Sequence, residues 1–268
     1  MITLIKDTIK PLYKYLLNKK EREFYRLFDG LRNYPRYKPV NDVKFFDYQF
    51  NITDALSFVW QVKEIFIDEV YRFKTDSTKP VIIDCGSNIG TSLLYFAKTY
   101  KNAEITGFEA DPNIASLSTL NLIRNNIFDV EISNKAVWVN DGGVKFSIDG
   151  ADGGNVISST KTVEVASIRL KNLLIKMPTI DLLKIDIEGA EYDVMVDCSD
   201  SLENVKNIFI EYHSWNTNKQ KLSEIINVLE KNNFRYYIED ITKRKLPFIN
   251  QNRETNMDLQ LNIFGYKN

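Results

Sequence analysis

A glycine-containing segment at residues 81–90 has the residue types and spacing of a ligand-binding loop. It reads V-I-I-D-C-G-S-N-I-G, so a short apolar strand ends at Asp84, and Gly86 and Gly90 precede a predicted helix. Nucleotide-type ligands bind at such junctions, beyond the carboxyl ends of parallel strands. Gly86 can adopt the positive φ of a tight turn, and Gly90 lets the helix begin close to the strand. The segment therefore predicts a loop that holds a nucleotide-type ligand.

Three residues indicate which ligand this loop would hold. Asn88 stands where a dinucleotide fingerprint has its second glycine, so its side chain would obstruct a pyrophosphate. The carboxylate of Asp84 would repel a diphosphate but suits the ammonium group of an amino acid. Glu109 ends the second predicted strand, where it is placed to bind the two hydroxyls of a ribose. A ligand with an amino-acid end and an unphosphorylated ribose is S-adenosylmethionine.

Two alternatives compete with that cofactor: a nicotinamide cofactor, and a helix-start loop that holds no ligand. Short-chain dehydrogenases need Tyr-x-x-x-Lys after the nucleotide-binding unit, but this spacing occurs here only before it, at Tyr15/Lys19 and Tyr34/Lys38. The sequence also contains no G-x-x-x-x-G-K-[S/T] loop for a nucleoside triphosphate. S-adenosylmethionine is the interpretation that we prefer.

A cluster of carboxylates follows a later apolar strand. The segment I-D-L-L-K-I-D-I-E-G-A-E at residues 180–191 ends its strand with Asp186 and Glu188, which share a face if the strand stays extended. In an open α/β sheet the end of this strand adjoins the end of the first, so both carboxylates are candidate site residues. For Glu191 the sequence favours a capping role, because a carboxylate stabilises the first turn of a helix.

The only histidine of the sequence follows the next predicted strand. The segment I-F-I-E-Y-H at residues 208–213 places Glu211 and His213 on one face of that strand. A lone histidine is often structural, yet its position at the carboxyl end of a strand suits acid–base chemistry. Both interpretations of His213 stay open at the level of sequence.

Strands alternate with helices from residue 81 onward, which predicts an α/β fold with a mostly parallel sheet and helices on both faces. Asp111 and Pro112 begin one helix in the favoured way, with an apolar stripe at Ile114, Leu117, Leu120 and Ile123. Between residues 138 and 170, Asp141-Gly142-Gly143 indicates a hairpin turn and Asp152-Gly153-Gly154-Asn155 a further loop. The predicted strands are 81–84, 105–110, 130–137, 162–168, 182–187, 208–212, 234–238 and 259–266. The predicted helices are 90–100, 112–124, 170–177, 190–196 and 219–232.

The first 79 residues differ from this pattern and are expected to form an N-terminal helical extension, followed by a catalytic domain at residues 80–268. An irregular helix with Pro11 inside its apolar stripe is predicted within residues 1–40. A polar, turn-rich stretch follows. Residues 54–73 are predicted to form an amphipathic helix that begins at Asp54.

Composition restricts the class of protein. The 268 residues carry a net charge of −1, and 44% of them are apolar, which excludes a mainly disordered chain. One histidine excludes a multi-histidine metal site, and Cys85 and Cys198 are too few for a disulfide framework. No signal-peptide core or spanning segment is visible, so we expect a cytoplasmic protein with free thiols.

The near-zero net charge hides an asymmetry. Residues 1–40 contain ten basic and four acidic residues and so carry +6, which leaves −7 on the remainder. The basic segment could contact an anionic substrate or membrane surface, or it could be a solvated helix that packs on its own domain. No nucleic-acid partner is expected, because the body is acidic and no N-P-P-Y-like motif occurs.

Four motifs together resemble FkbM-type S-adenosylmethionine-dependent methyltransferases over roughly residues 81–240. They are D-C-G-S-N-I-G, G-F-E-A-D-P, L-L-K-I-D-I-E-G-A-E and E-Y-H. The resemblance implies a class I methyltransferase fold, which is Rossmann-like and has a seven-stranded sheet whose last strand is antiparallel. It also implies O-methylation of a hydroxyl, often on a sugar or glycolipid and sometimes on a polyketide. The usual L-D-x-L appears here as R-L-K-N-L-L, with Arg169 and Lys171.

The resemblance also implies roles for individual residues. Carried over as cofactor residues are Asp84, Gly86, Asn88, Gly90 and Glu109, and the candidate cofactor-binding set also includes Ser87, Thr91, Ala110, Asn134 and Ala136. The residues expected to line the reaction side are Asp186, Glu188, Glu191, Glu211 and His213.

The resulting hypothesis is an O-methyltransferase that acts on a hydroxyl of a small molecule, such as a sugar, glycolipid or polysaccharide precursor. His213 or Asp186 is the candidate base, and Glu188 and Glu211 would orient that base or the acceptor hydroxyls. Asp186, Glu188 and Glu211 could alternatively hold Mg²⁺, although no metal is expected. Two other functions stay open: a non-catalytic subunit that binds S-adenosylmethionine, and a methyltransferase that acts on nucleic acid.

Overall fold

A seven-stranded sheet organises the computed structural model, which describes residues 18–147, 162–241, 245–250 and 257–267. Strand β13 lies antiparallel to both of its neighbours, whereas the other neighbouring strands are parallel. This arrangement confirms the expected class I methyltransferase fold. In spatial order the strands are β12 (Arg235–Asp240), β13 (Met257–Tyr266), β11 (Val205–Trp215), β10 (Ile180–Ile185), β3 (Val81–Cys85), β4 (Glu104–Phe108) and β5 (Val130–Ser133).

The central strands are apolar because both faces of the sheet are covered. All six residues of β10 are buried, as expected for a parallel strand between two helical layers. β10 pairs with β3 so that Lys184 stands beside Asp84 and Ile185 beside Cys85. The carboxyl ends of these two strands therefore meet at one edge of the sheet, as the sequence predicted.

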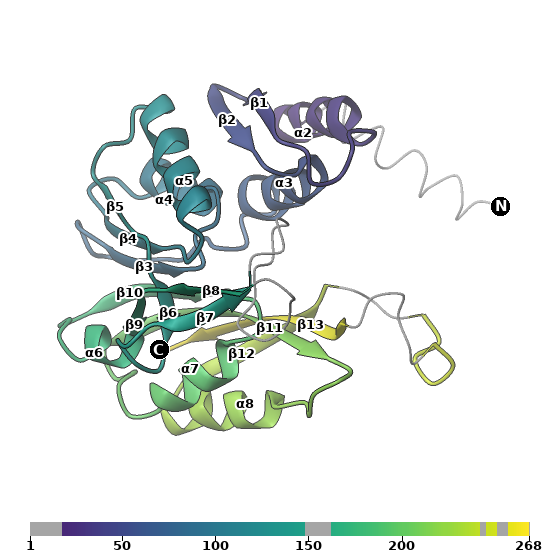
Figure 1. Ribbon diagram of the computed structural model, residues 1–268. Coiled ribbons are helices and arrows are strands. Elements are labelled where there is room, and N and C mark those ends of the chain that lie inside the picture. Colours follow the sequence, from purple (N-terminus) through teal and green to yellow (C-terminus); the bar gives the residue numbers. More distant parts are fainter. Residues whose placement is uncertain (1–17, 148–161, 242–244, 251–256, 268) are drawn as a thin grey trace.

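Helices cover both faces of the sheet (Figure 1). On one face lie α4 (Thr91–Thr99) and α5 (Pro112–Arg124), and on the other lie α6 (Leu170–Leu174), α7 (Glu191–Asp197) and α8 (Leu222–Lys231). Each layer has its own hydrophobic cluster. Cys85 and Cys198 are buried free thiols, as expected.

Helix α5 begins as predicted but turns a different face inward. Asp111 caps its first turn by accepting from the backbone N–H of Asn113 at 2.7 Å. The predicted apolar stripe is wrong at its end, because Leu120 and Ile123 are 42% and 49% exposed. Asn121 is buried instead, since its side-chain amide donates to the carbonyl of Asn51 in a strand of the N-terminal extension and to that of Ile89 in the glycine loop. Hydrogen bonding, not apolar periodicity, sets the orientation of this turn.

The N-terminal extension contains a β-hairpin that the sequence pattern did not predict. Helix α2 (Lys19–Leu31) is followed by β1 (Val40–Phe45) and β2 (Tyr48–Ile52), which pair antiparallel. The expectation of a purely helical extension is therefore wrong. The polar residues of the turn-rich stretch before β2 concealed the short alternation that buries Val43, Phe45, Phe50 and Ile52.

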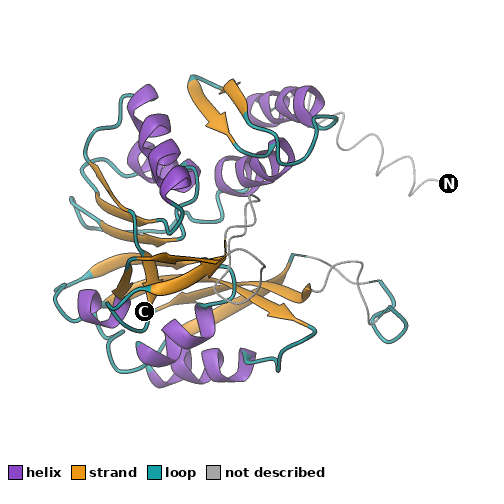
Figure 2. Cartoon of the chain, in the orientation of Figure 1, coloured by secondary structure: helices purple, strands orange, loops and turns teal. Residues whose placement is uncertain are grey.

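The helix predicted at residues 54–73 begins where expected and ends earlier. Asp54 caps α3 (Ala55–Val62) by accepting from the backbone N–H of Ser57 at 2.9 Å. The chain then changes to one π-helical turn, η1 (Lys63–Ile67). The colours of Figure 2 show this hairpin–helix unit packed beside α4 and α5.

Basic residues of the extension pair with carboxylates of the same chain. Lys20 lies 3.0 Å from Glu69, and Arg36 lies 2.9 Å from the buried carboxylate of Asp54. Part of the positive charge of residues 1–40 is therefore used in packing the extension on its own domain.

The region that follows β5 departs from the predicted pattern. The strand expected at residues 130–137 is divided into β5 and β6 (Ala136–Trp138), and β6 pairs in parallel with β9 (Ser167–Arg169). β7 (Val144–Ser147) pairs antiparallel with β8 (Thr162–Val165). The prediction of a hairpin turn at Asp141-Gly142-Gly143 is wrong, because β6 and β7 do not pair. The carboxylate of Asp141 instead accepts from the backbone N–H of Arg169 at 2.8 Å.

Two predicted features lie outside the described residues: the apolar stripe around Pro11 and the loop Asp152-Gly153-Gly154-Asn155. Among the helices that the structure describes, none combines the length and the apolar character needed to cross a membrane.

Candidate active site

A cavity of about 330 Å³ opens at the carboxyl ends of the parallel strands. The loops after β3, β4 and β5 form one part of its wall, and the ends of β10 and β11 form another. Residues of α3 and η1 complete it. The cavity therefore joins the glycine loop to the acidic cluster, as the sequence predicted from strand order.

The glycine loop has a backbone that only glycine accommodates. Gly86 has a φ of +85°, and a Cβ atom on it would lie 1.7 Å from the backbone oxygen of Asp186. Gly90 precedes α4 with a φ of +86°, and a Cβ there would lie 2.5 Å from Oγ of Ser118. The backbone N–H groups of Gly86 and Ser87 both donate to the carbonyl of Phe108 at 2.9 Å. The loop is thus fixed against β4 and the end of β10, and its residues Gly86, Ser87 and Asn88 line the cavity.

Glu109 lies at the end of β4 and faces this loop. Its carboxylate accepts from the backbone N–H groups of Asn88 and Asp111, each at 2.9 Å. Burial raises the pKa of Glu109 to about 7. Glu109 lines the cavity, and its role in binding two vicinal hydroxyls stays a prediction.

Asp84 has a different environment from the one that the sequence pattern predicted. Its side chain is fully buried and forms an ion pair with Lys184 at 2.9 Å. The hydroxyl of Ser92 donates to the same carboxylate. Among the described residues that line the cavity, Lys184 is present and Asp84 is not. Asp84 therefore positions Lys184 beneath the loop and does not itself line the cavity.

Lys184 places a buried cation at the site. Its ammonium group also donates to the carbonyl of Gly86 at 3.0 Å and lies 3.4 Å from the carboxylate of Asp186. Burial opposes the charged form, but Asp84 and Asp186 raise the pKa of Lys184 well above its usual range. Lys184 therefore connects the glycine loop to the acidic cluster.

The structure brings most of the predicted cofactor residues to the cavity wall. Asn134 does not line it, because its side-chain amide donates to the carbonyls of Glu109 and Ala110. Gly90 begins α4 without lining the cavity. Seven of the candidates do line it: Gly86, Ser87, Asn88, Thr91, Glu109, Ala110 and Ala136.

Asp186, Glu188 and Glu211 form the acidic wall of the cavity. Burial, with repulsion from Glu211, raises the pKa of Asp186 to about 7. Burial likewise raises the pKa of Glu188 to about 8. Glu211 accepts a hydrogen bond from the side-chain amide of Gln260. Despite burial, hydrogen bonding to His213 holds the pKa of Glu211 below its usual value.

His213 lies behind this wall and does not line the cavity. Its Nδ1 atom is 3.1 Å from Glu191, and its Nε2 atom is 3.7 Å from Glu188 and 3.6 Å from Glu211. Although burial disfavours the charge, Glu191 and Glu188 raise the pKa of His213 well above its usual range. His213 is therefore a buried imidazolium that holds three carboxylates together.

Glu191 stabilises the turn before α7. Its carboxylate accepts from the backbone N–H groups of Ile187 and Gly189, at 3.1 and 3.0 Å. Gly189 has a φ of +102°, and a Cβ on it would meet the ring of Trp215. The sequence favoured a capping role for Glu191 at the helix. In the structure Glu191 caps the turn before α7 and also contacts His213.

The acidic cluster also has the ligand types of a cation site. Single ligand atoms of Asp186, Glu211 and His213 all lie within 4.8 Å of one another. Lys184 already supplies a positive charge 3.4 Å from Asp186. The expectation of a site without metal stays a prediction.

Several residues of the cavity were missed at the level of sequence. Trp60, Gln61 and Glu64 come from the N-terminal extension, and Gln260 comes from β13. Glu64 stood in a predicted amphipathic helix, where a charged residue indicates a solvated face. The π-helical turn that directs Glu64 to the cavity cannot be predicted from the spacing of apolar residues.

The sheet order, the antiparallel strand β13 and a cavity at the carboxyl ends of the parallel strands are those of the class I methyltransferase fold. The model of the methyltransferase FkbM domain matches residues 84–236, more than half of the chain. The chain therefore belongs to the FkbM methyltransferase family, and its cofactor is S-adenosylmethionine.

Three relatives are similar to this chain over half of its length or more. Methyltransferase sdnD of Sordaria araneosa is 31% identical over 193 residues, covering 56% of this chain and 72% of that protein. Methyltransferase 1 of Beauveria bassiana is 27% identical over 176 residues, covering 56% of this chain and 71% of that protein. The 2-O-methyltransferase NoeI of Sinorhizobium fredii is 28% identical over 158 residues, covering 50% of this chain and 63% of that protein.

Proposed function

We propose that this methyltransferase transfers a methyl group to a hydroxyl of a sugar, a glycolipid or a polysaccharide precursor. The observation that carries the proposal is the wall of three carboxylates, Asp186, Glu188 and Glu211, in the same cavity as the glycine loop. Carboxylate oxygens accept hydrogen bonds from hydroxyl groups, so this wall suits an acceptor with several hydroxyls. The name of the relative NoeI, a 2-O-methyltransferase, supports oxygen as the atom that is methylated.

The glycine-loop end of the cavity fits the cofactor. Gly86, Ser87 and Asn88 of the loop line the cavity, and Glu109 beside them would accept from the two hydroxyls of the ribose. The small side chains of Ala110 and Ala136 would leave room for the adenine ring. When bound, S-adenosylmethionine supplies an electrophilic methyl group on a sulfonium.

The acidic wall would hold the acceptor. A hydroxyl held there would be close to the transferable methyl group, and such positioning supplies much of the acceleration in two-substrate reactions. The sulfonium would supply the methyl group for the acceptor oxygen, and a base of the acidic wall would take the proton of that hydroxyl.

Asp186 is the better of the two candidate bases. It lines the cavity, and its pKa of about 7 is close to neutral pH, where a general base is most effective. His213 is charged and already contacts carboxylates through both of its nitrogens. We therefore assign proton removal to Asp186 and the positioning of Glu188 and Glu211 to His213.

The proposed partner is a small-molecule or glycan acceptor, and we expect no nucleic-acid partner. The pairs Lys20–Glu69 and Arg36–Asp54 reduce the positive charge that the N-terminal segment offers to an anionic surface. A peripheral contact with an anionic substrate or membrane would have to use the remaining basic residues of residues 1–40.

The proposal is tested by incubating the protein with S-adenosylmethionine and a panel of nucleotide sugars, neutral glycosides and glycolipids. Mass spectrometry should detect the mass of one added methylene group on at least one acceptor. The Asp186→Asn variant should lose this product but retain cofactor affinity. Cofactor binding without any product would contradict the proposal and indicate a non-catalytic subunit. Methylation of RNA in the same assay would indicate a nucleic-acid methyltransferase.

A further inference from the structure

The N-terminal extension supplies part of the cavity wall. Trp60 and Gln61 of α3 and Glu64 of η1 line the cavity together with the strand ends. The family model matches only from residue 84 onward, so these residues lie outside the matched domain. The site therefore includes chemistry that membership of the family does not explain.

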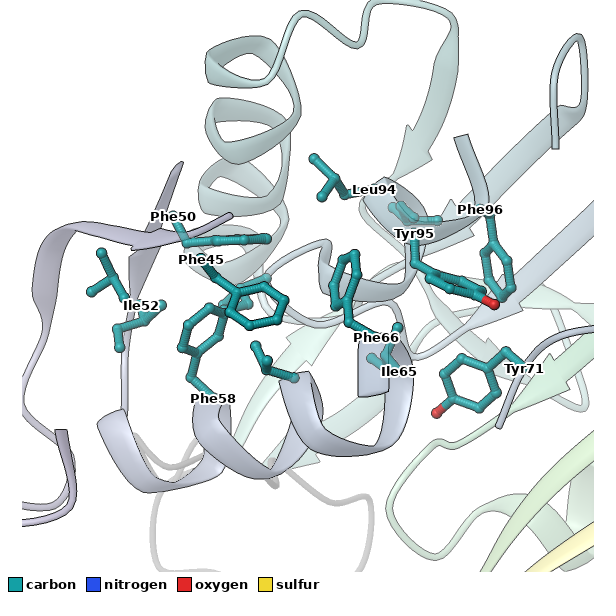
Figure 3. Close-up of a cluster of buried hydrophobic side chains, with 14 of the residues drawn as sticks. Phe45, Phe50, Ile52, Phe58, Ile65, Phe66, Tyr71, Leu94, Tyr95 and Phe96 are labelled. Atoms are coloured by element: carbon teal, nitrogen blue, oxygen red, sulfur yellow. The ribbon is translucent and has the colours of Figure 1, made fainter. Parts of the chain in front are cut away.

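The π-helical turn fixes the position of Glu64. The backbone N–H of Asp68 donates to the carbonyl of Lys63 at 2.9 Å, which closes this wider turn. Single π turns often occur at functional sites. The two residues after Glu64, Ile65 and Phe66, are buried in the aromatic cluster of Figure 3. With its neighbours anchored in the core, Glu64 is held at the cavity.

A hydrogen bond connects this segment to the start of α4, directly after the glycine loop. The hydroxyl of Thr91, the first residue of α4, donates to the side-chain oxygen of Gln61 at 2.9 Å. Gln61 and Glu64 are three residues apart, so they lie near each other along the same helical surface. The N-terminal extension is therefore held next to the loop that precedes α4.

The carboxylate of Glu64 lines the cavity and is not engaged by the part of the chain that the structure describes. Among the residues that the structure describes, none donates a hydrogen bond to this carboxylate or forms an ion pair with it. Burial, followed by repulsion from Glu211 and Asp186, raises the pKa of Glu64 to about 7. This half-buried carboxyl group lines the cavity, where the hydroxyl of a ligand can donate to it.

We propose that Glu64 is an acceptor-binding residue, whose carboxyl group hydrogen-bonds a hydroxyl next to the one that is methylated. This proposal rests on the proposed function. The charged neighbours of Glu64 are Asp186 and Glu211, which belong to the acidic wall. Glu109, in contrast, contacts the loop at the cofactor end. Trp60, which is 54% exposed, adds an aromatic surface from the same segment. The carboxyl groups of Glu64, Asp186, Glu188 and Glu211 can all bind hydroxyls, so the acceptor is a polyol at its methylated end.

Thiol labelling distinguishes the acceptor side of the cavity from the cofactor side without a known acceptor. The variants are Glu64→Cys and, at the proposed adenine end, Ala110→Cys. Labelling by iodoacetamide would be followed by mass spectrometry with and without saturating S-adenosylhomocysteine. The native thiols Cys85 and Cys198 are buried, and burial raises the pKa of both, so they give little background.

We expect S-adenosylhomocysteine to slow labelling of Cys at position 110 by tenfold or more and at position 64 by less than about twofold. Equal protection of both positions would overturn the proposal, because Glu64 would then contact the cofactor. Protection of neither position would overturn the proposed function as well, since the cavity would not be the cofactor site. The two failures are therefore distinguishable.

The isosteric variant Glu64→Gln gives a second readout if the cysteine variant does not fold. Loss of one hydrogen bond should raise the KM of the best acceptor of the panel by roughly threefold to tenfold, with cofactor affinity changed less than about twofold. Asp68→Asn is the matched control, because it removes a carboxylate from the exposed end of the same segment and should change neither value. An unchanged KM with weaker cofactor binding would contradict the proposal.

Discussion

The ammonium group of Lys184 lies 2.9 Å from the carboxylate of Asp84, and neither side chain is more than 3% exposed. The two residues stand side by side on β10 and β3. Ser92 adds a hydrogen bond from α4. Because the pair connects two central strands and a helix directly below the glycine loop, it stabilises the floor of the cavity.

Removal of one member of this pair should destabilise the protein strongly. Lys184→Met leaves Asp84 as an uncompensated buried charge, and such changes cost about 3–5 kcal/mol. Urea unfolding followed by circular dichroism would measure the loss. As a control, Lys79→Met breaks an ion pair with Glu104 whose side chains are 63% and 54% exposed, and should cost at most about 1 kcal/mol. Equal losses in both variants would show that burial of the pair is unimportant.

Gly86→Ala should prevent the native loop from forming. The added Cβ would lie 1.7 Å from the backbone oxygen of Asp186, and the φ of +85° is unfavourable for alanine. We expect a lower midpoint of thermal unfolding and loss of cofactor binding. Gly30→Ala is the matched control, because no atom lies within 4 Å of its added Cβ. Its midpoint should stay the same or rise, since alanine favours helix. A Gly86→Ala variant as stable as Gly30→Ala would contradict this expectation.

The rate of methyl transfer should increase with pH between about pH 6 and pH 8. Asp186 must be ionised to accept a proton, and its pKa of about 7 places the midpoint in this range. Asp186→Asn should lower kcat by about 10²- to 10⁴-fold and remove the inflection. Asp200→Asn, which alters an exposed carboxylate paired with Lys171, should leave the profile unchanged. An Asp186→Asn enzyme with the full rate would exclude Asp186 as the base.

Thermal stability should decrease as the pH rises from about 5 to about 8. Burial raises the pKa of Asp186 to about 7 and that of Glu188 to about 8. A carboxyl group with a raised pKa contributes stability that is complete below its unfolded-state value and is lost as the pH rises through its folded-state value. Glu188→Gln should therefore flatten the curve, whereas Glu131→Gln, at an exposed position on β5, should not. A midpoint of thermal unfolding of the wild type that rises over this pH range would contradict the raised pKa values of Asp186 and Glu188.

The features that sequence patterns predicted well are those set by local spacing and strand order. Glu109 and the glycine loop meet because each follows a strand, and parallel strands bring their carboxyl ends to one edge. Asp186 and Glu188 reach the same cavity for the same reason. The capping of α3 by Asp54 was also visible, because a cap depends on only a few neighbouring residues.

Other features depend on contacts between distant residues and leave no local pattern. The spacing around Asp84 does not show that Lys184, a hundred positions later, neutralises it. Glu64 reaches the cavity through a π turn whose neighbours are anchored in the core (Figure 3). His213 offered two interpretations, and only the positions of Glu191 and Glu188 decide that it is a buried cation.

Calorimetric titration of the wild type and the Glu109→Ala variant with S-adenosylmethionine tests the central claim most directly. We expect one site in the wild type and an affinity roughly tenfold to a hundredfold weaker in the variant, because the variant lacks the carboxyl group that we propose accepts from both ribose hydroxyls. Glu104→Ala, at the other end of the same strand β4, should bind like the wild type. No binding to the wild type, or equal affinity in Glu109→Ala, would contradict the assignment of this cavity to the cofactor.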